Sequence, residues 1–230
     1  MIRTGSLFAG IGGLELGLEM TGHFKTCWQV ELDEYASRVL AKHWPEIPRW
    51  PDVKTFPPDD WTQEMTEVSL VAGGFPWQDI SVAGRGGGLL GDRSGLFFEI
   101  IRIAGILRPR WLLMENVSAL MSRGLDQCLA AIDEAGYNSE WHCLTASSCG
   151  ALHRRDRVFI ISTRKDIPFR RIITERPDPR DWDSWDVEPD IPRITTDKVP
   201  KRPDRLKGLG NAVVPQVGQF IGQMIAEAIR

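Results

Sequence analysis

The sequence has few cysteines and no long apolar run. Its four cysteines, Cys27, Cys128, Cys143 and Cys149, form no C-x-x-C pair, so neither a disulfide framework nor a zinc site is expected. No apolar stretch approaches the roughly 20 residues that span a bilayer, and the N-terminus reads as a strand rather than a signal peptide. These absences favour a soluble, cytoplasmic protein with free thiols.

Internal repeats and low-complexity segments are also missing. A chain of 230 residues with 42% hydrophobic residues can bury one substantial core. We expect a monomer with a main domain over residues 1–163, a short loop-rich insert over 164–204, and a C-terminal segment over 205–230 that returns to the main domain.

Basic residues are not in overall excess, because the formal net charge is −3. This balance argues against a uniformly basic nucleic-acid binder. Positive charge is nevertheless concentrated between Arg154 and Arg171. That stretch predicts a surface facing phosphates, with a solvated charged face as the alternative.

Apolar strand-like segments alternate with helical ones over the first 136 residues, which predicts a doubly wound, mostly parallel α/β sheet. The expected strands and helices are 2–8, 24–31, 69–72 and 111–114, and 14–20, 34–43, 96–107 and 127–135. After Gly136, segments 140–146 and 158–163 are joined by a short loop, so we expect an antiparallel pair at the sheet edge. A terminal amphipathic helix is expected over 216–229.

A glycine-rich turn follows the first expected strand, at Phe8-Ala9-Gly10-Ile11-Gly12-Gly13, and Glu31 ends the second. This pattern places backbone N–H groups and a carboxylate around a nucleoside-bearing ligand. Many dinucleotide-binding folds share it, and a tight turn alone also requires glycine.

Four further motifs follow in order: Gly73–Ser81, Glu115-Asn116-Val117, Arg155-Asp156-Arg157 and Gly210–Pro215. Together with the glycine turn, this series resembles the DNA cytosine-C5 methyltransferases over nearly the whole chain. The resemblance implies a Rossmann-like fold, S-adenosyl-L-methionine as cofactor, with S-adenosyl-L-homocysteine as product, and double-stranded DNA as partner.

The resemblance also implies a cofactor site. In it Glu31 binds the ribose hydroxyls, Leu32 stacks on the adenine and Asp52 accepts from the adenine amino group. For the leucines and valines, plain core packing is the alternative. The implied set is Phe8, Gly10, Gly12, Gly13, Leu14, Glu31, Leu32, Asp52, Val53, Pro76, Leu96, Asn211 and Val213.

The chemistry of this family requires more than a pocket, because C5 of cytosine is a poor nucleophile until a group adds to C6. The family uses a cysteine thiolate for that addition. By resemblance, Glu115 binds N3 and the exocyclic amine, and Arg157 meets O2 of the base. Arg155 supports the same loop or a phosphate, or is an exposed salt-bridging arginine.

Trp77 occupies the position of the expected nucleophile, directly after Phe75-Pro76. Indole has no ionisable thiol, so three explanations are open: an inactive relative, a substitution introduced by an experimenter, or a nucleophile elsewhere. Cys149 directly precedes the arginine motif, and nearby arginines can raise its thiolate fraction. We therefore predict that Cys149 opens into the cavity of Glu115 and Arg157, and that the other three cysteines are core.

Three interpretations follow. The first is an enzyme that flips a cytosine from DNA, adds Cys149 to C6 and methylates C5. The second is a non-catalytic DNA- or cofactor-binding module. The third, a tRNA methyltransferase with this fold, would also be expected to keep the cysteine after Phe75-Pro76.

Overall fold

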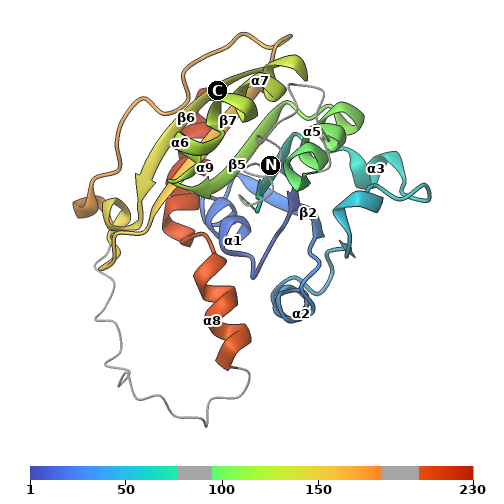
Figure 1. Cartoon of the computed structure of the whole chain (residues 1–230), viewed down its shortest axis with the longest axis horizontal. Helices are drawn as coiled ribbons and strands as arrows, with labels where there is room; N and C mark the ends of the chain where they lie inside the picture. Colours follow the sequence, from blue (N-terminus) through green and yellow to red (C-terminus); the bar gives the residue numbers. More distant parts are fainter. Residues whose placement is uncertain (77–94, 183–201, 230) are drawn as a thin grey trace.

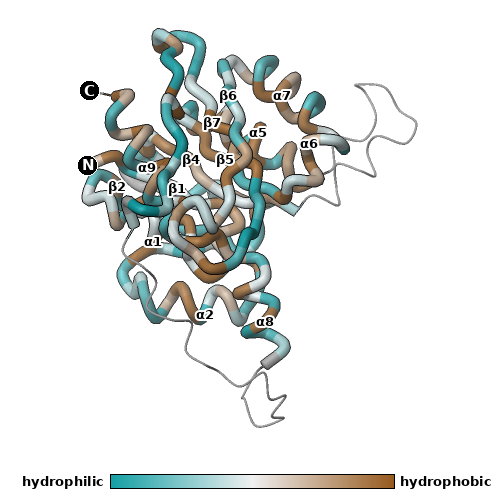
Figure 2. The backbone as a smooth tube through the Cα atoms, turned by 90° about the vertical axis from the view of Figure 1, so that its left-hand side faces the viewer, coloured by the Kyte–Doolittle hydropathy of each residue, from teal (hydrophilic) through white to brown (hydrophobic). Residues whose placement is uncertain are grey.

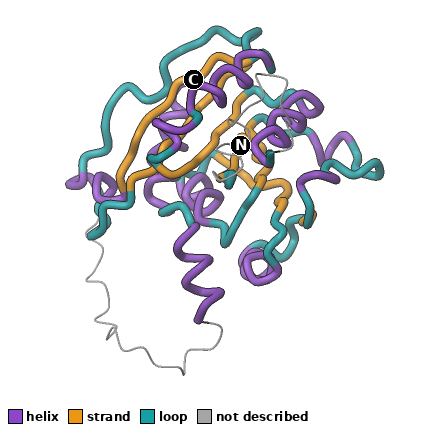
Figure 3. The backbone as a smooth tube through the Cα atoms, in the orientation of Figure 1, coloured by secondary structure: helices purple, strands orange, loops and turns teal. Residues whose placement is uncertain are grey.

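The computed structural model describes residues 1–76, 95–182 and 202–229. Its centre is a seven-stranded sheet in the order β3-β2-β1-β4-β5-β7-β6, with helices on both faces (Figures 1 and 3). No helix in these ranges is both long and apolar enough to span a membrane.

The strands alternate with helices along the first half of the chain and then form a hairpin. Strands β1 to β5 are parallel, whereas β7 runs antiparallel to both β5 and β6. The predicted α/β sheet with an antiparallel pair is therefore confirmed. The strands are β1 (Ile2–Leu7), β2 (Phe24–Val30), β3 (Arg49–Trp50), β4 (Leu70–Gly74), β5 (Trp111–Val117), β6 (Tyr137–Thr145) and β7 (Asp156–Arg164).

The helices connect and cover these strands. The α-helices are α1 (Gly13–Met20), α2 (Glu34–His43), α3 (Gln63–Thr66), α5 (Leu96–Leu107), α6 (Leu120–Arg123), α7 (Leu125–Glu134), α8 (Arg202–Asn211) and α9 (Pro215–Ile229). The described residues also contain the short 3₁₀ turns η1 (Val53–Thr55), η2 (Ala146–Cys149) and η3 (Pro179–Asp181).

The sheet separates two apolar cores because side chains alternate along each strand. On β7, Val158 and Ile160 pack with α5 and α7, whereas Phe159 and Ile161 pack with α1 and α9. Figure 2 shows the corresponding brown, apolar course of the inner strands. Burial on both faces explains the continuous apolar runs of the central strands.

Helices α1 and α9 cross at glycines. A Cβ atom on Gly17 would lie 2.2 Å from the carbonyl oxygen of Pro215, and one on Gly218 would lie 3.4 Å from the Cα of Gly17. Glycine therefore allows the two backbones to touch. This contact ties the end of the chain to the helix that follows the glycine turn.

Candidate active site

The carboxyl ends of the parallel strands open into one cavity of about 1210 Å³. This edge of an open α/β sheet is where such folds bind ligands. The volume exceeds the roughly 300–1,000 Å³ of a typical small-molecule site. There is room for a nucleoside cofactor and a second group beside it.

The glycine turn forms the floor of the cavity. Gly10 (φ 58°) and Gly12 (φ 89°) adopt left-handed conformations that favour glycine. The N–H of Gly10 donates to Glu31 Oε2 at 2.6 Å. Gly13 touches the C-terminal segment, since a Cβ there would lie 2.1 Å from the carbonyl oxygen of Val213.

Glu31 is fixed at the end of β2 by two backbone donors. Gly10 N–H bonds one carboxylate oxygen, and Asp33 N–H donates to the other at 2.7 Å. Burial raises the pKa of Glu31, and these two hydrogen bonds oppose that shift. The carboxylate is thereby oriented as an acceptor for ligand hydroxyl groups.

The C-terminal segment forms another wall, where Lys207 in the middle of α8 contacts the N-terminus of α2. Lys207 Nζ lies 2.6 Å from Asp33 Oδ2, and Lys207, Gly208 and Asn211 all line the cavity. Lys207 and Asp33 were missed by sequence reasoning. A long-range pair on an unpredicted helix leaves no local sequence signal.

The structure brings nearly all of the predicted cofactor residues together. Gly12 is the exception: its position faces the ring of Trp44, 2.4 Å from where a Cβ would stand. The residues on the cavity wall are Phe8, Gly10, Gly13, Leu14, Glu31, Leu32, Asp52, Val53, Pro76, Leu96, Asn211 and Val213.

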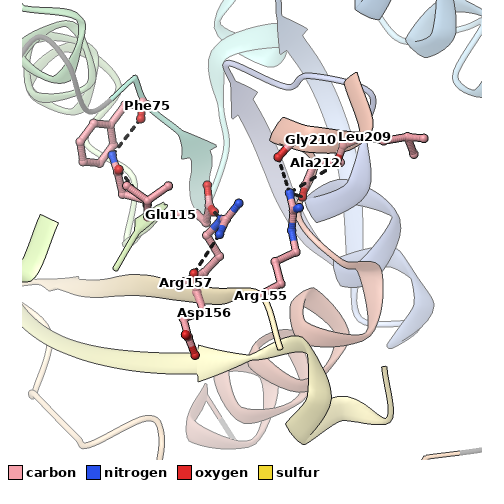
Figure 4. A network of polar contacts seen from close by, with 10 residues as sticks. Phe75, Glu115, Arg155, Asp156, Arg157, Leu209, Gly210 and Ala212 are labelled. Atoms are coloured by element: carbon pink, nitrogen blue, oxygen red, sulfur yellow. Dashed lines mark hydrogen bonds and ion pairs between the residues drawn. The ribbon is translucent and has the colours of Figure 1, made fainter. Parts of the chain in front are cut away.

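Glu115, which is buried, and Arg157, which is partly buried, form an ion pair at the β5 side of the same cavity (Figure 4). Arg157 Nε lies 2.8 Å from Glu115 Oε1. Register explains the pairing: Arg157 stands opposite Val117, two residues from Glu115 on the same face of the sheet. Burial raises the pKa of Glu115 to about 7, and Arg157 opposes that shift.

Asn116 links β5 to the loop that precedes Trp77. Its Nδ2 donates to the carbonyl of Phe75 at 2.8 Å, and its Oδ1 accepts from Val117 N–H at 2.8 Å. A Cβ on Gly74 would lie 2.7 Å from Glu115 Oε2, so glycine leaves that carboxylate space. The structure thus gives Asn116 a positioning contact that the motif alone did not reveal.

Arg155 does not line the large cavity. Its Nη2 donates to the carbonyls of Gly210 at 2.7 Å and Ala212 at 2.6 Å, with a longer contact to Leu209 at 3.4 Å. Of the roles that the sequence predicted for Arg155, these contacts fit the support of a loop. The loop that Arg155 supports is the C-terminal segment, however, and not the loop that carries the base-contacting Arg157.

The prediction that Cys149 opens into the cavity is wrong. Its side chain is 0% exposed, packs in the core formed with α1 and α9, and is absent from the cavity wall. Burial raises the pKa of its thiol to about 11, the opposite of activation. Cys143 corrects another expectation, because it is exposed on β6 rather than core.

The four cysteines all lie in the described ranges, and none of them lines the cavity. Pro76 is the last described residue before the position of interest, and Trp77 falls outside the described residues.

The basic stretch does not form one face beside the cavity. Strand β7 separates Arg157, at the cavity edge, from Arg164, at the opposite edge, by about 23 Å at roughly 3.3 Å per residue. Arg164 pairs with Asp166, and Lys165 with Asp133. Residues 154–171 are therefore not gathered at the cavity edge, and a phosphate-facing role for the stretch stays a prediction.

Comparison with known proteins agrees with this geometry. A family model for C-5 cytosine-specific DNA methylase matches residues 2–205. The type II methyltransferase M.Sau3AI of Staphylococcus aureus is 34% identical over 194 residues, covering 76% of this chain and 47% of that protein. M.Eco47II of Escherichia coli is 33% identical, covering 85% of this chain and 49% of that protein.

Among solved structures, a Spodoptera frugiperda DNMT2 mutant superposes with a TM-score of 0.58 at 20% identity, covering 74% of this chain and 53% of that one. This likeness shows the shared fold. The chain spans about half the length of the relatives that it matches. With the family model covering most of its length, the chain belongs to the C-5 cytosine-specific DNA methylase family.

Proposed function

We propose that this chain holds S-adenosylmethionine and a cytosine flipped from double-stranded DNA in a cytosine-C5 methyltransferase site whose transfer step is blocked by Trp77. One observation carries the proposal. The Glu31 pocket and the Glu115–Arg157 pair line the same cavity, while the chain's cysteines all lie elsewhere. The cavity therefore has the residues that would bind the cofactor and the base, but it lacks the cysteine thiol that would add to C6.

The residues present fit the cofactor. Glu31 is oriented for ribose hydroxyls, Gly13 lets the backbone of Val213 approach the glycine turn, and Asn211 lines the same cavity. S-adenosylmethionine supplies an electrophilic methyl group when bound. The chain's own part is to orient that ligand and exclude water around it.

The base half is built for cytosine. With its pKa near 7, Glu115 is protonated in a large fraction of molecules at neutral pH, so it can donate to N3 of the ring. Its second oxygen can accept from the exocyclic amine. Arg157, held against Glu115 at 2.8 Å, places positive charge where O2 of a flipped base would develop negative charge.

The covalent step is the missing element. C5 becomes nucleophilic only after addition at C6, and tryptophan cannot perform that addition. Cys149, the alternative nucleophile in an active enzyme, would have to leave a core in which it is fully buried. We therefore favour the catalytically inactive, cofactor- and DNA-binding form.

The test is Trp77→Cys. The unmodified chain should bind S-adenosylmethionine in calorimetry but transfer no tritiated methyl group to DNA, whereas Trp77→Cys should gain transfer and form a covalent adduct with 5-fluorocytosine DNA. Trp77→Ser is the matched control, since it removes the indole without adding a thiol, and should stay inactive.

Two results would contradict the proposal. Methylation by the unmodified chain that disappears in Cys149→Ala would reinstate the relocated nucleophile. Failure of the folded chain to bind S-adenosylmethionine would remove the cofactor assignment altogether.

A further inference from the structure

Arg155 joins two segments that are far apart in the sequence. It lies just before β7, in the left-handed region (φ 40°), and its Nη2 reaches the carbonyls of Leu209, Gly210 and Ala212. Figure 4 shows Arg155 and Arg157 rising from the same end of β7, Arg155 toward these carbonyls and Arg157 toward Glu115.

The segment that Arg155 holds is a wall of the cofactor cavity. Gly210, Asn211, Ala212 and Val213 all line it, and Val213 packs against Gly13 of the glycine turn. Within the described segment, Ala212 N–H also donates to Gly208 at 3.0 Å. Charge-assisted hydrogen bonds from Arg155 therefore provide a substantial share of the constraint on this wall.

Arg155 also belongs to the electrostatics of the base pocket. Its positive charge lowers the pKa of Glu115, while burial, followed by the neighbouring Arg157, lowers the pKa of Arg155 itself. Its Nε is buried without a hydrogen-bond partner in the described structure. Such a cation is costly to place unless its remaining donors are well used.

We propose that Arg155 is a positioning residue that couples the cofactor wall to the cytosine pocket, so that each ligand strengthens the binding of the other. This inference rests on the proposed function for the identity of the two ligands. A ligand that holds the wall against Gly13 also holds the backbone carbonyls to which Arg155 donates. A base that holds Glu115 and Arg157 in place fixes the charges that act on Arg155, and so favours the same conformation of the Arg155 side chain. Coupling of this kind is reciprocal.

Arg155→Lys isolates the geometry, because lysine keeps the charge but ends about one bond short of Nη2. The matched control is Arg164→Lys at the other end of β7, where the arginine also donates to a backbone carbonyl, that of Arg108. Affinity for S-adenosylhomocysteine should fall about tenfold in Arg155→Lys and be unchanged in Arg164→Lys.

The coupling is read from the same titrations with and without a cytosine-containing duplex. DNA should tighten S-adenosylhomocysteine binding by the unmodified chain severalfold, and this factor should fall toward one in Arg155→Lys. Amide hydrogen exchange over residues 208–213 of the ligand-free variant should also accelerate, which a loss of DNA-contacting charge would not cause.

The exchange measurement separates this inference from the proposed function. If the unmodified chain binds no S-adenosylhomocysteine, the proposed function fails, while faster exchange at 208–213 still supports the role of Arg155. Unchanged exchange at residues 208–213 would overturn the inference. Weaker DNA binding with unchanged S-adenosylhomocysteine affinity would also overturn it, and would indicate that Arg155 binds a phosphate instead.

Discussion

Two buried carboxyl groups, Glu115 and Glu15, line the cavity. Burial raises the pKa of Glu115 and of Glu15 to about 7 each. Glu115 has Arg157 as a partner, whereas Glu15 accepts a hydrogen bond from Ser6 and its Oε2 has no partner in the described structure. The neutral form of both groups is therefore favoured by folding.

This balance predicts that stability falls as pH rises. Unfolded carboxyls ionise near pH 4.5, and the folded ones near 7, so between these values the unfolded state binds fewer protons and the free energy of unfolding decreases. Glu115→Gln should remove on the order of 3 kcal/mol of that decrease, while Glu15 and Glu31, whose pKa values burial also raises, contribute to the rest. Urea unfolding at pH 5 and pH 8 measures it; equal pH dependence in both proteins would refute it.

Sequence reasoning at single residues succeeded where strand register decided the outcome. Glu115 and Arg157 were predicted to share a cavity, and antiparallel pairing of β5 with β7 puts them there. It failed for Cys149, because nearness in sequence to Arg155 does not determine which way a side chain faces. The 3₁₀ turn η2, closed by Gly150 at φ 84°, directs Cys149 into the core.

At the scale of elements, the predicted bounds of two helices match the structure. Helix α2 begins after Asp33, whose side chain accepts from Ala36 N–H, and both α2 and α5 have the predicted bounds. Helix α8 was missed because Pro203, Gly208 and Gly210 interrupt any helical signal. Its position depends instead on contacts such as Lys207 with Asp33.

The crossing of α1 and α9 gives a test of element packing. Gly17→Ala should destabilise the protein by about 1–3 kcal/mol, since the added Cβ would lie 2.2 Å from the carbonyl oxygen of Pro215. Gly105→Ala in α5 is the control, because a Cβ there meets nothing within 4 Å, and alanine should stabilise that helix slightly. Thermal unfolding compares the two; equal effects would show that the crossing tolerates side chains.

At the scale of the whole molecule, the basic residues of 154–171 lie near the two ends of β7. We expect DNA at only one of these ends. Arg154 lies three residues before Arg157, which lines the cavity, and its side chain is 81% exposed. The exposed Arg205 lies on α8, whose Lys207 and Gly208 line the cavity. Arg170 and Arg171 are exposed in the segment after β7. Phosphates that accompany a flipped base should meet the first pair.

Arg154→Glu with Arg205→Glu should therefore weaken duplex binding and reduce the salt dependence of log Kd by about two, the effect of two lost phosphate contacts. Arg170→Glu with Arg171→Glu makes the same change in net charge and should have a much smaller effect. Fluorescence anisotropy over a salt series gives both slopes. Equal slopes would mean that DNA follows net charge rather than the cavity edge.

The contact between Gly13 and Val213 has a consequence in time. Glu31 and Val213 stand on the same cavity, but about 180 residues of synthesis, or roughly 10–40 s, separate them on the ribosome. Throughout that interval Leu14 and Leu18 of α1 lack the α9 residues that cover them. A nascent chain thus displays an uncovered apolar stripe beside a half-built pocket, and we expect chaperone protection to be required at this stage.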